Sequence, residues 1–360
     1  MNKEYLQFIV SQFDVDFTEV IINEFGAGLI NKTFLVIGQN KKSKERFILQ
    51  QINKKIFKHP PLVMENIHRV ANHLSAKGFY QKQLEIILSK NGQLYVEDLQ
   101  NEFWRMFPFI ENTFVLNEIT AKKTAYEGAK AFGDFLKMLW DMDTNFMHIS
   151  IPDFHNTPLR FQHFTNTVLE GPPERNNLAK AEIHFFKKQA HLLTSLPTNF
   201  PIRVTHNDTK INNILFDTDT KEGISVIDWD TLMPGWIIHD FGDMVRTFTN
   251  PVGEEEVKFS KVFMNIDFFK ALSKGFMESL ASFLSPIEKE NLVHGALVIT
   301  YEQGIRFLTD YLLGNIYYKV EYAEQNLVRA QNQIVLLKSM LRQRKEMEQI
   351  ISRLSNINFI

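Results

Sequence analysis

The chain contains no cysteine among its 360 residues. Disulfide bonds and thiolate metal sites are therefore excluded, and a reducing cytoplasm is the expected location. An excess of either charge is also missing, since 40 basic and 42 acidic residues give a formal net charge of −2. A protein that binds nucleic acids or anionic membranes in general would carry a basic excess, so we expect neither partner.

Long apolar runs are absent as well. No stretch of about 18 apolar residues occurs, so no membrane-spanning helix is expected. The N-terminal segment 1–17 carries acidic residues close behind its short apolar run and lacks a small-residue cleavage site, which argues against a signal peptide. With 44% hydrophobic and 23% charged residues, the composition is that of an ordinary soluble globular protein.

The length suggests two packed regions, and the first of them is rich in strands. Segment 61–78 opens with prolines and ends at Gly78, which predicts a helix, and the pair Asn91-Gly92 predicts a hairpin turn. β-branched and aromatic runs bounded by turn residues predict strands over 17–25, 33–38, 46–52, 84–88, 92–99 and 102–110.

After Pro108 the pattern becomes helical. Apolar residues recur at helical spacing over 117–142, 179–196 and most of 259–355, and only 202–230 shows short strands around two loops. The final helix carries an apolar stripe and is expected to pack on the protein instead of forming a partner-binding arm. We therefore predict an α+β fold with a small antiparallel-sheet N-lobe and a larger, mainly helical C-lobe.

One bend, "VTHNDTKINNIL" at 204–215, gathers polar side chains between apolar flanks. Asp208 and Asn213 lie in this bend, and a following strand ends at Asp228, so we expect all three at one edge. An amide and a carboxylate are hard oxygen ligands suited to Mg²⁺, which predicts Asn213 and Asp228 as metal ligands. Asp208 can then accept a hydrogen bond from a substrate hydroxyl, while Lys210 can reach a phosphate.

The spacing His-x-Asp-x₄-Asn, followed by "IDWD", resembles the catalytic loop and the metal-binding aspartate of protein-kinase-like phosphotransferases. The wider pattern resembles the N-acetylhexosamine 1-kinases, within the aminoglycoside phosphotransferase and choline kinase family. This resemblance covers nearly the whole chain. It rests on segments 25–36, 46–53, 203–215, 227–235, 240–246, 304–318 and 326–334.

The resemblance implies a kinase-like bilobal fold, with nucleotide bound by an N-lobe at 1–107 and a catalytic loop and sugar pocket in a C-lobe at 108–360. It further implies ATP and Mg²⁺ as cofactors and direct in-line phosphorylation of the C1 hydroxyl of an N-acetylhexosamine. Asp208 would orient and deprotonate that hydroxyl, and Lys210 would contact the phosphate. His206 is expected to brace the loop, and Asp240 to accept hydrogen bonds from its backbone.

A glycine-containing hairpin, "FGAGLINKTFLV" at 25–36, allows backbone N–H groups to approach phosphates closely. Gln50 stands where the superfamily carries a lysine or arginine, and strand alternation turns Arg46 away from that place. The aromatic link near 104–110 is expected to supply an adenine slot. The predicted nucleotide-binding residues are Gly26, Gly28, Asn31, Thr33, Gln50, Met106, Phe107 and Phe109.

The acceptor side is predicted in segment 301–318, where Glu302, Arg306 and Asp310 share one face of a helix. An ordinary salt-bridged helix face would show the same spacing. The resemblance implies a sugar pocket instead, with Leu29 and Thr247 departing from the relatives. The predicted acceptor-binding residues are Asp208, Arg306, Tyr317, Leu29 and Thr247.

Two alternatives remain open at this point. A kinase of the same fold could act on an aminoglycoside, choline or homoserine, although an aminoglycoside site should be acidic and a choline site an aromatic cage. A non-catalytic nucleotide-binding module is suggested by Gln50, but the acid–amide–acid set at Asp208, Asn213 and Asp228 would be unnecessary in such a module.

Overall fold

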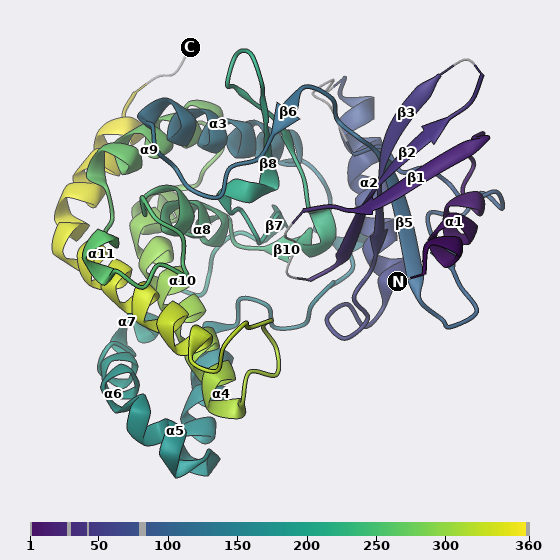
Figure 1. Cartoon of the computed structure of the whole chain (residues 1–360). Helices are drawn as coiled ribbons and strands as arrows, with labels where there is room; N and C mark the ends of the chain where they lie inside the picture. The colour runs from purple at the N-terminus through teal and green to yellow at the C-terminus, as the bar shows by residue number, and fades with distance from the viewer. Residues whose placement is uncertain (1, 27–29, 42, 79–83, 358–360) are drawn as a thin grey trace. The chain divides into compact units, whose positions relative to one another are not determined.

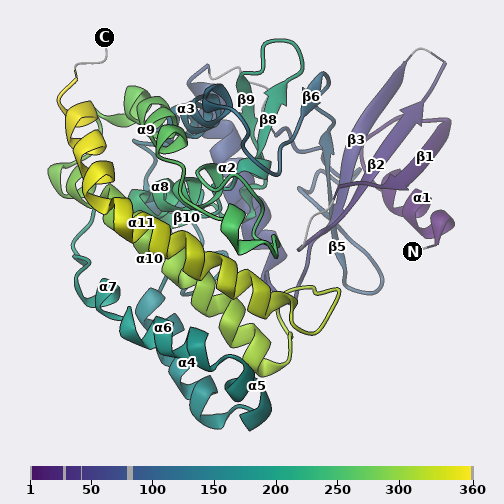
Figure 2. The same ribbon diagram turned by 60° about the vertical axis from the view of Figure 1, so that its left-hand side comes forward.

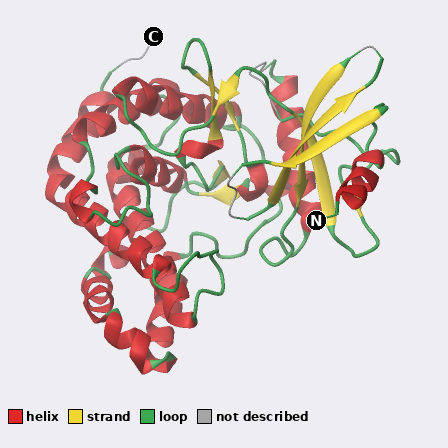
Figure 3. Ribbon diagram, viewed as in Figure 1, coloured by secondary structure: helices red, strands yellow, loops and turns green. Residues whose placement is uncertain are grey.

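The computed structural model describes residues 2–26, 30–41, 43–78 and 84–357. It consists of two compact units. Unit 1 comprises Met1–Thr113, Asn145–Pro152 and Ile227–Met233, and unit 2 comprises Phe114–Thr144, Asp153–Val226 and Pro234–Ile360. Figure 3 shows unit 1 built around long strands and unit 2 built mainly from helices, so the predicted α+β class is confirmed.

Unit 1 contains an antiparallel sheet with the strand order β1-β2-β3-β5-β4. The predicted meander is confirmed, because β1 pairs with β2 and β2 with β3 along their whole lengths. β3 also pairs with β5, which places Gln50 opposite Arg105. The strands are β1 (Glu19–Glu24), β2 (Lys32–Gln39), β3 (Lys44–Gln51), β4 (Val96–Glu97) and β5 (Phe103–Pro108).

The two faces of this sheet differ in chemistry because neighbouring side chains alternate between them. One face forms an apolar core against α1 (Lys3–Ser11), and Phe34, Leu49 and Trp104 are among its buried members. The opposite face carries Gln50 and Arg105 and lies toward α2 (Pro60–Ala76), as Figure 1 shows. Polar groups are therefore concentrated on a single side of the sheet.

Two predicted strands of unit 1 differ from the structure. Segment 84–88 forms a single isolated bridge, between Ile87 and Met106, in place of a strand. The strand expected over 92–99 is reduced to β4. Both pair with the same edge of β5, so neither has room for a long ladder. The turn expected at Asn91-Gly92 is confirmed, since Gly92 has a φ of 73°.

In unit 2, helices α10 and α11 run side by side, with α8 packed on α10 (Figure 2). A capping box at Ser285 begins α10, and Gly314, with a φ of 97°, ends it in the left-handed conformation that favours glycine. The helices are α3 (Lys122–Met138), α4 (Thr157–Glu170), α5 (Pro173–Leu178), α6 (Lys180–Lys188), α7 (His191–Thr194), α8 (Ile237–Phe248), α9 (Ile266–Leu280), α10 (Pro286–Leu313) and α11 (Gln325–Ser355).

Helix boundaries in unit 2 differ from the predicted ones at several points. The helix expected over 117–142 is the shorter α3, and the one expected over 179–196 is divided into α6 and α7. No helix within the described part of the chain is both long and apolar enough to cross a membrane.

The bend that contains Asp208, predicted as the catalytic loop, lies between β7 (Arg203–Thr205) and β8 (Ile214–Asp217). β8 forms a hairpin with β9 (Gly223–Val226), which packs against α3. β9 ends at Val226, earlier than predicted, so Asp228 is not the last strand residue. Asp228 instead adopts a φ of 63° and precedes a single helical turn at Trp229–Thr231.

Candidate active site

Asp240, in the first turn of α8, holds the backbone of the catalytic loop. Its two carboxylate oxygens accept hydrogen bonds from the backbone N–H groups of His206, at 2.8 Å, and Asn207, at 2.7 Å. Asn207 adopts a φ of 64°, an unfavourable conformation for a non-glycine residue that such bonds can maintain. Burial raises the pKa of Asp240 to about 7, against the opposing effect of the two N–H donors. The predicted hydrogen bonds from the loop backbone to Asp240 are confirmed.

His206 is a structural residue, as predicted. Its side chain is fully buried, and its ring packs edge-on against Phe132 at 5.4 Å and Phe135 at 6.3 Å between centroids. Its Nδ1 atom accepts a hydrogen bond from the backbone N–H of Asp208, at 3.3 Å. This ring therefore orients the residue that carries the predicted catalytic carboxylate.

Asp208, Lys210 and Asn213 come together within one loop. Lys210 Nζ lies 2.6 Å from Asp208 Oδ2, and Asn213 Nδ2 donates to the Asp208 backbone carbonyl at 2.9 Å. The Asn213 amide nitrogen also lies 3.2 Å from Asp208 Oδ2. Because this nitrogen points at Asp208, the Oδ1 atom of Asn213 is the one that can act as a metal ligand.

Asp208 is held in its charged form. Burial raises its pKa, but the adjacent Lys210 ammonium, with smaller effects from His206 and Arg246, lowers it. The net pKa is below its ordinary value, so Asp208 is a carboxylate at neutral pH. Such a group can accept a hydrogen bond from a hydroxyl and then its proton.

A buried polar network in unit 1 surrounds the segment that contains Asp228. Asp230, two residues after Asp228, forms a salt bridge with Arg105, and both side chains are at most 3% exposed. Asn31 donates to the other Asp230 oxygen at 2.7 Å. Arg105 Nε also donates to Gln50 Oε1 at 3.0 Å. These contacts tie β3, β5 and the glycine hairpin to segment 227–233.

Arg105 is a functional candidate that the sequence did not reveal. Gln50 replaces the expected cationic residue, and the register places the Arg105 guanidinium directly across from it. The only local signal was an arginine inside an otherwise apolar strand, "FWRMFPF". Glu65 of α2 contacts His148 at 2.8 Å and Arg69 at 3.2 Å.

The remaining residues predicted to bind nucleotide differ in how far they are buried. Gly26 has a φ of 73°, consistent with a tight turn, and the Thr33 hydroxyl accepts a hydrogen bond from Gln50 at 3.1 Å. Met106 is fully buried in the sheet core and Phe107 is nearly so, which leaves Phe109 as the half-buried member of the link. Gly28 and Leu29 lie outside the described residues.

On the acceptor side, Arg306 of α10 is surrounded by aromatic rings. Its guanidinium carbon lies 5.1 Å from the ring centroid of Phe154 and 5.9 Å from those of Tyr317 and Tyr318. Gln303 Oε1 accepts a hydrogen bond from Arg306 Nη1 at 3.3 Å. Arg306 forms no salt bridge within the described part of the chain, so most of its N–H groups remain for a ligand.

Glu302, Arg306 and Asp310 of α10 do not form salt bridges with one another, unlike the charged residues of an ordinary salt-bridged helix face. Glu302 contacts His155 at 2.8 Å, and Asp310 accepts backbone N–H bonds from Tyr317 and Tyr318 at 2.8 and 3.0 Å. Asp310 thereby positions the loop that carries both tyrosines. Glu302, Arg306 and Asp310 therefore each contact a different part of the structure.

A second arginine, Arg160 of α4, belongs to the same region. Its Nε atom is buried and has no hydrogen-bond partner among the residues that the structure describes. Burial lowers the pKa of Arg160, and the positive charge of Arg306 lowers it further. Thr247, also predicted on the acceptor side, donates within α8 to the carbonyl of Asp243 at 3.1 Å, beside the buried Arg246.

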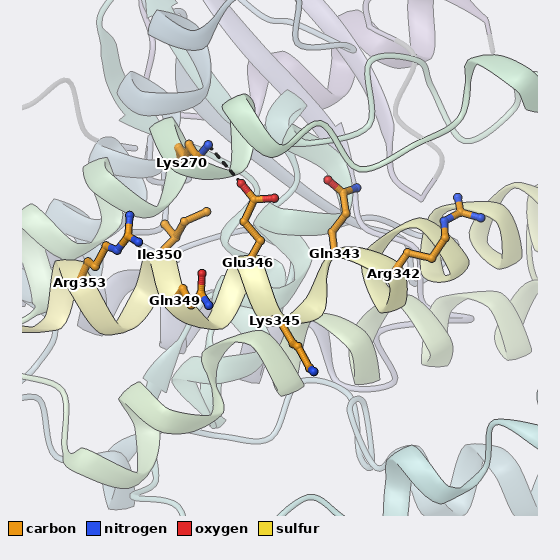
Figure 4. A pocket seen from close by; sticks show the side chains of 8 residues that line it. All are labelled: Lys270, Arg342, Gln343, Lys345, Glu346, Gln349, Ile350 and Arg353. Carbon is orange, nitrogen blue, oxygen red and sulfur yellow. Dashed lines mark ion pairs between the residues drawn. The ribbon is translucent and has the colours of Figure 1, made fainter.

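A surface pocket of about 490 Å³ lies elsewhere in unit 2, between α9 and α11 (Figure 4). Lys270 of α9 and Glu346 of α11 form a salt bridge of 3.3 Å across it. None of the predicted site residues lines this pocket. In addition, no cluster of three or more His, Cys, Asp or Glu side chains suited to a metal occurs within the described ranges.

Comparisons with known proteins identify the family and the fold. The model of the phosphotransferase enzyme family matches residues 21–259. A microcompartment-associated aminopropanol kinase is similar in structure, with a TM-score of 0.60, 15% identity, and coverage of 96% of this chain and 99% of that one. A spectinomycin phosphotransferase in complex with ADP and spectinomycin has a TM-score of 0.59 at 12% identity, covering 99% of each chain.

A choline kinase from Cryptosporidium parvum Iowa II has a TM-score of 0.55 at 16% identity, covering 99% of this chain and all of the other. At such low identities these likenesses establish a shared fold. The antiparallel sheet of unit 1 and the helical unit 2 therefore have the fold of these kinase-like structures.

Proposed function

Because the chain belongs to the phosphotransferase enzyme family, we propose that it transfers the terminal phosphoryl group of ATP to the C1 hydroxyl of an N-acetylhexosamine. Asp208 accepts the hydrogen bond and the proton of the attacking hydroxyl. Lys210 holds the Asp208 carboxylate in its charged form and contacts the transferred phosphate. Asp240 and His206 keep the loop backbone in place, so that the attacking oxygen is positioned before reaction.

We also propose ATP and Mg²⁺ as the cofactors of this reaction. Mg²⁺, when bound, screens the negative charge of the ATP phosphates, and Asn213 and Asp228 are the residues that we propose as its protein ligands. The spectinomycin phosphotransferase of the same fold was solved with ADP, which supports an adenine nucleotide here. The rest of the mechanism depends on positioning and charge stabilisation by the protein.

The positive charge of the region around Arg306 is the observation from which we infer the class of acceptor substrate. Arg306 and Arg160 bring two cations to it. The nearest carboxylate on α10, Glu302, is already occupied by His155 at 2.8 Å and by the Thr157 hydroxyl. A region of this kind offers hydrogen-bond donors to the oxygen atoms of a substrate and repels cationic substrates.

The positive charge of this region favours a neutral sugar over the cationic substrates of other kinases with this fold. Choline and protonated aminopropanol are cations and need carboxylates or an aromatic cage without competing arginines. A neutral sugar that carries an acetamido group presents a carbonyl oxygen, which an arginine N–H can bind. Tyr317, Tyr318 and Phe154 provide flat surfaces against which a sugar ring can pack. These features support an N-acetylhexosamine.

The proposal is tested with the purified chain, Mg-ATP and a panel of acceptors. N-acetylglucosamine and N-acetylgalactosamine are expected to give the sugar 1-phosphate, identified by phosphorus NMR. Choline, aminopropanol and an aminoglycoside are expected to consume no ATP above the acceptor-free rate. A 6-phosphate product, or turnover with a cation alone, would overturn the assignment.

Replacing Arg306 tests the acceptor site separately. In Arg306→Met, the KM for the N-acetylhexosamine is expected to rise about 10- to 100-fold, the effect of losing a charged hydrogen bond. The KM for ATP should stay the same. Arg306→Lys is the matched control, because it keeps the charge and should recover part of the loss. Equal sugar KM values in the three proteins would remove Arg306 from the acceptor site.

A further inference from the structure

His155 lies in the loop before α4 and connects two parts of unit 2 that are distant in sequence. Its Nδ1 atom is 2.8 Å from Glu302 Oε1 on α10, and its Nε2 atom is 3.0 Å from the backbone carbonyl oxygen of Asn207 in the catalytic loop. Its side chain is 11% exposed and that of Glu302 is 2% exposed. Both ring nitrogens therefore face oxygen atoms away from bulk water.

We propose that His155 is a positioning residue that carries a proton on each ring nitrogen and ties the catalytic loop to the acceptor helix α10. A backbone carbonyl can only accept, and the Glu302 carboxylate already accepts from the Thr157 hydroxyl. A neutral imidazole has a single N–H and would place its other nitrogen lone pair against an oxygen. The doubly protonated ring satisfies both contacts.

The surroundings agree with this protonation state. Burial lowers the pKa of His155, but the Glu302 carboxylate and the Asn207 carbonyl together raise it, so the net pKa is above the ordinary 6.5. Burial raises the pKa of Glu302, but its contacts with His155, Arg306 and Thr157 together lower it, to about 2. From α8, Asp240 favours the charged ring, and Arg306 of α10 opposes it.

A second histidine, His239 of α8, packs against the His155 ring at 5.1 Å between centroids. Burial and the neighbouring His155 lower the pKa of His239 to about 3, so this ring stays neutral and adds no competing charge. The Phe154 ring, at 4.7 Å, covers another side of His155. The single imidazolium of this cluster is therefore His155.

The bond to Asn207 acts where the loop needs support. Asn207 immediately precedes Asp208, and its N–H is bound by Asp240 while its carbonyl is bound by His155. The peptide groups on both sides of this residue are thus held by two titratable side chains. Since Glu302 lies one helical turn from Arg306, the same contact links the position of Asp208 to the acceptor-binding side of α10.

The protonation of His155 can be tested without any acceptor. Nitrogen NMR of protein labelled at histidine is expected to show one imidazolium, with both nitrogens protonated, at about pH 7.5, where free histidine is neutral. The His155→Asn variant identifies the signal by its disappearance. A neutral pattern for His155 at this pH would overturn the inference. This arm is independent of the proposed function, so its outcome stands even if no acceptor is turned over.

The positioning role is tested by kinetics, which rest on the proposed function. Asn can keep a donor near the Nδ1 position for Glu302 but cannot reach the carbonyl of Asn207. His155→Asn is therefore expected to lower kcat about tenfold, the worth of one hydrogen bond, with little change in the KM for ATP. His184→Asn is the matched control, because His184 is exposed, and it should leave kcat unchanged. A His155→Asn kcat equal to that of the control contradicts the role.

The pH profile adds a readout that a purely structural role would not change. Because the pKa of His155 is raised, its two bonds are present below the ordinary value and are lost as pH rises through the raised pKa. The wild-type kcat should fall along this alkaline limb. In Glu302→Gln, the amide can donate to Nδ1 of a neutral ring whose Nε2–H still binds Asn207, so the limb should disappear. Superimposable profiles of the two proteins would refute the assignment.

Discussion

Asp208→Asn is expected to lower kcat by a factor of about 10²–10⁴, the usual contribution of a positioned general base, while ATP still binds. The carboxamide has nearly the same size as the carboxylate but cannot accept the proton of an attacking hydroxyl. Lys210 loses its salt-bridge partner, yet its side chain is 30% exposed and remains hydrated, so folding should be preserved. Turnover is measured from product formation and nucleotide binding by calorimetry.

The matched control for this variant is Asp219→Asn. Asp219 is exposed in the turn between β8 and β9 and contacts no predicted site residue, so its neutralisation should leave kcat unchanged. If Asp208→Asn keeps near-normal turnover, Asp208 is not the group that activates the acceptor. If both activity and ATP binding are lost, the effect is on the fold of the loop.

The largest effect on stability is expected from Arg105→Met. This substitution leaves the Asp230 carboxylate buried and without its cation, and removing one partner of a buried ion pair typically costs about 3–5 kcal/mol. The free energy of unfolding is measured by urea denaturation, followed by the fluorescence of tryptophan. Trp104, which is fully buried in unit 1, reports on the sheet that contains the mutation.

Two further variants show whether loss of the Arg105–Asp230 ion pair causes the loss of stability. Arg344→Met removes the cation of an exposed pair with Glu348, in which the side chains are 39% and 44% exposed, and should cost less than about 1 kcal/mol. Arg105→Met combined with Asp230→Asn leaves no uncompensated charge and should recover much of the loss. A cost of less than about 1 kcal/mol for Arg105→Met alone would mean that the pair adds little to unit 1.

Predictions based on local patterns were accurate where the signal and its physical cause lie within one short segment. Alternating β-branched residues identified β1, β2, β3 and β5, because side-chain alternation is a property of the strand itself. The loop spacing likewise identified the group of Asp208, Lys210 and Asn213. Segment 84–88 failed because a strand also needs a free partner edge, and β5 offered it room for only one bridge.

The sequence by itself determined the α+β class, the loop that brings Asp208, Lys210 and Asn213 together, and the glutamine at position 50 in place of the expected cation. Only the tertiary structure decided which groups surround Gln50 and which hold the loop. Arg105 and Asp230 are 125 residues apart, and His155 and Glu302 are 147 residues apart. Contacts over such separations depend on strand register and helix packing, and no local pattern in a single sequence specifies them.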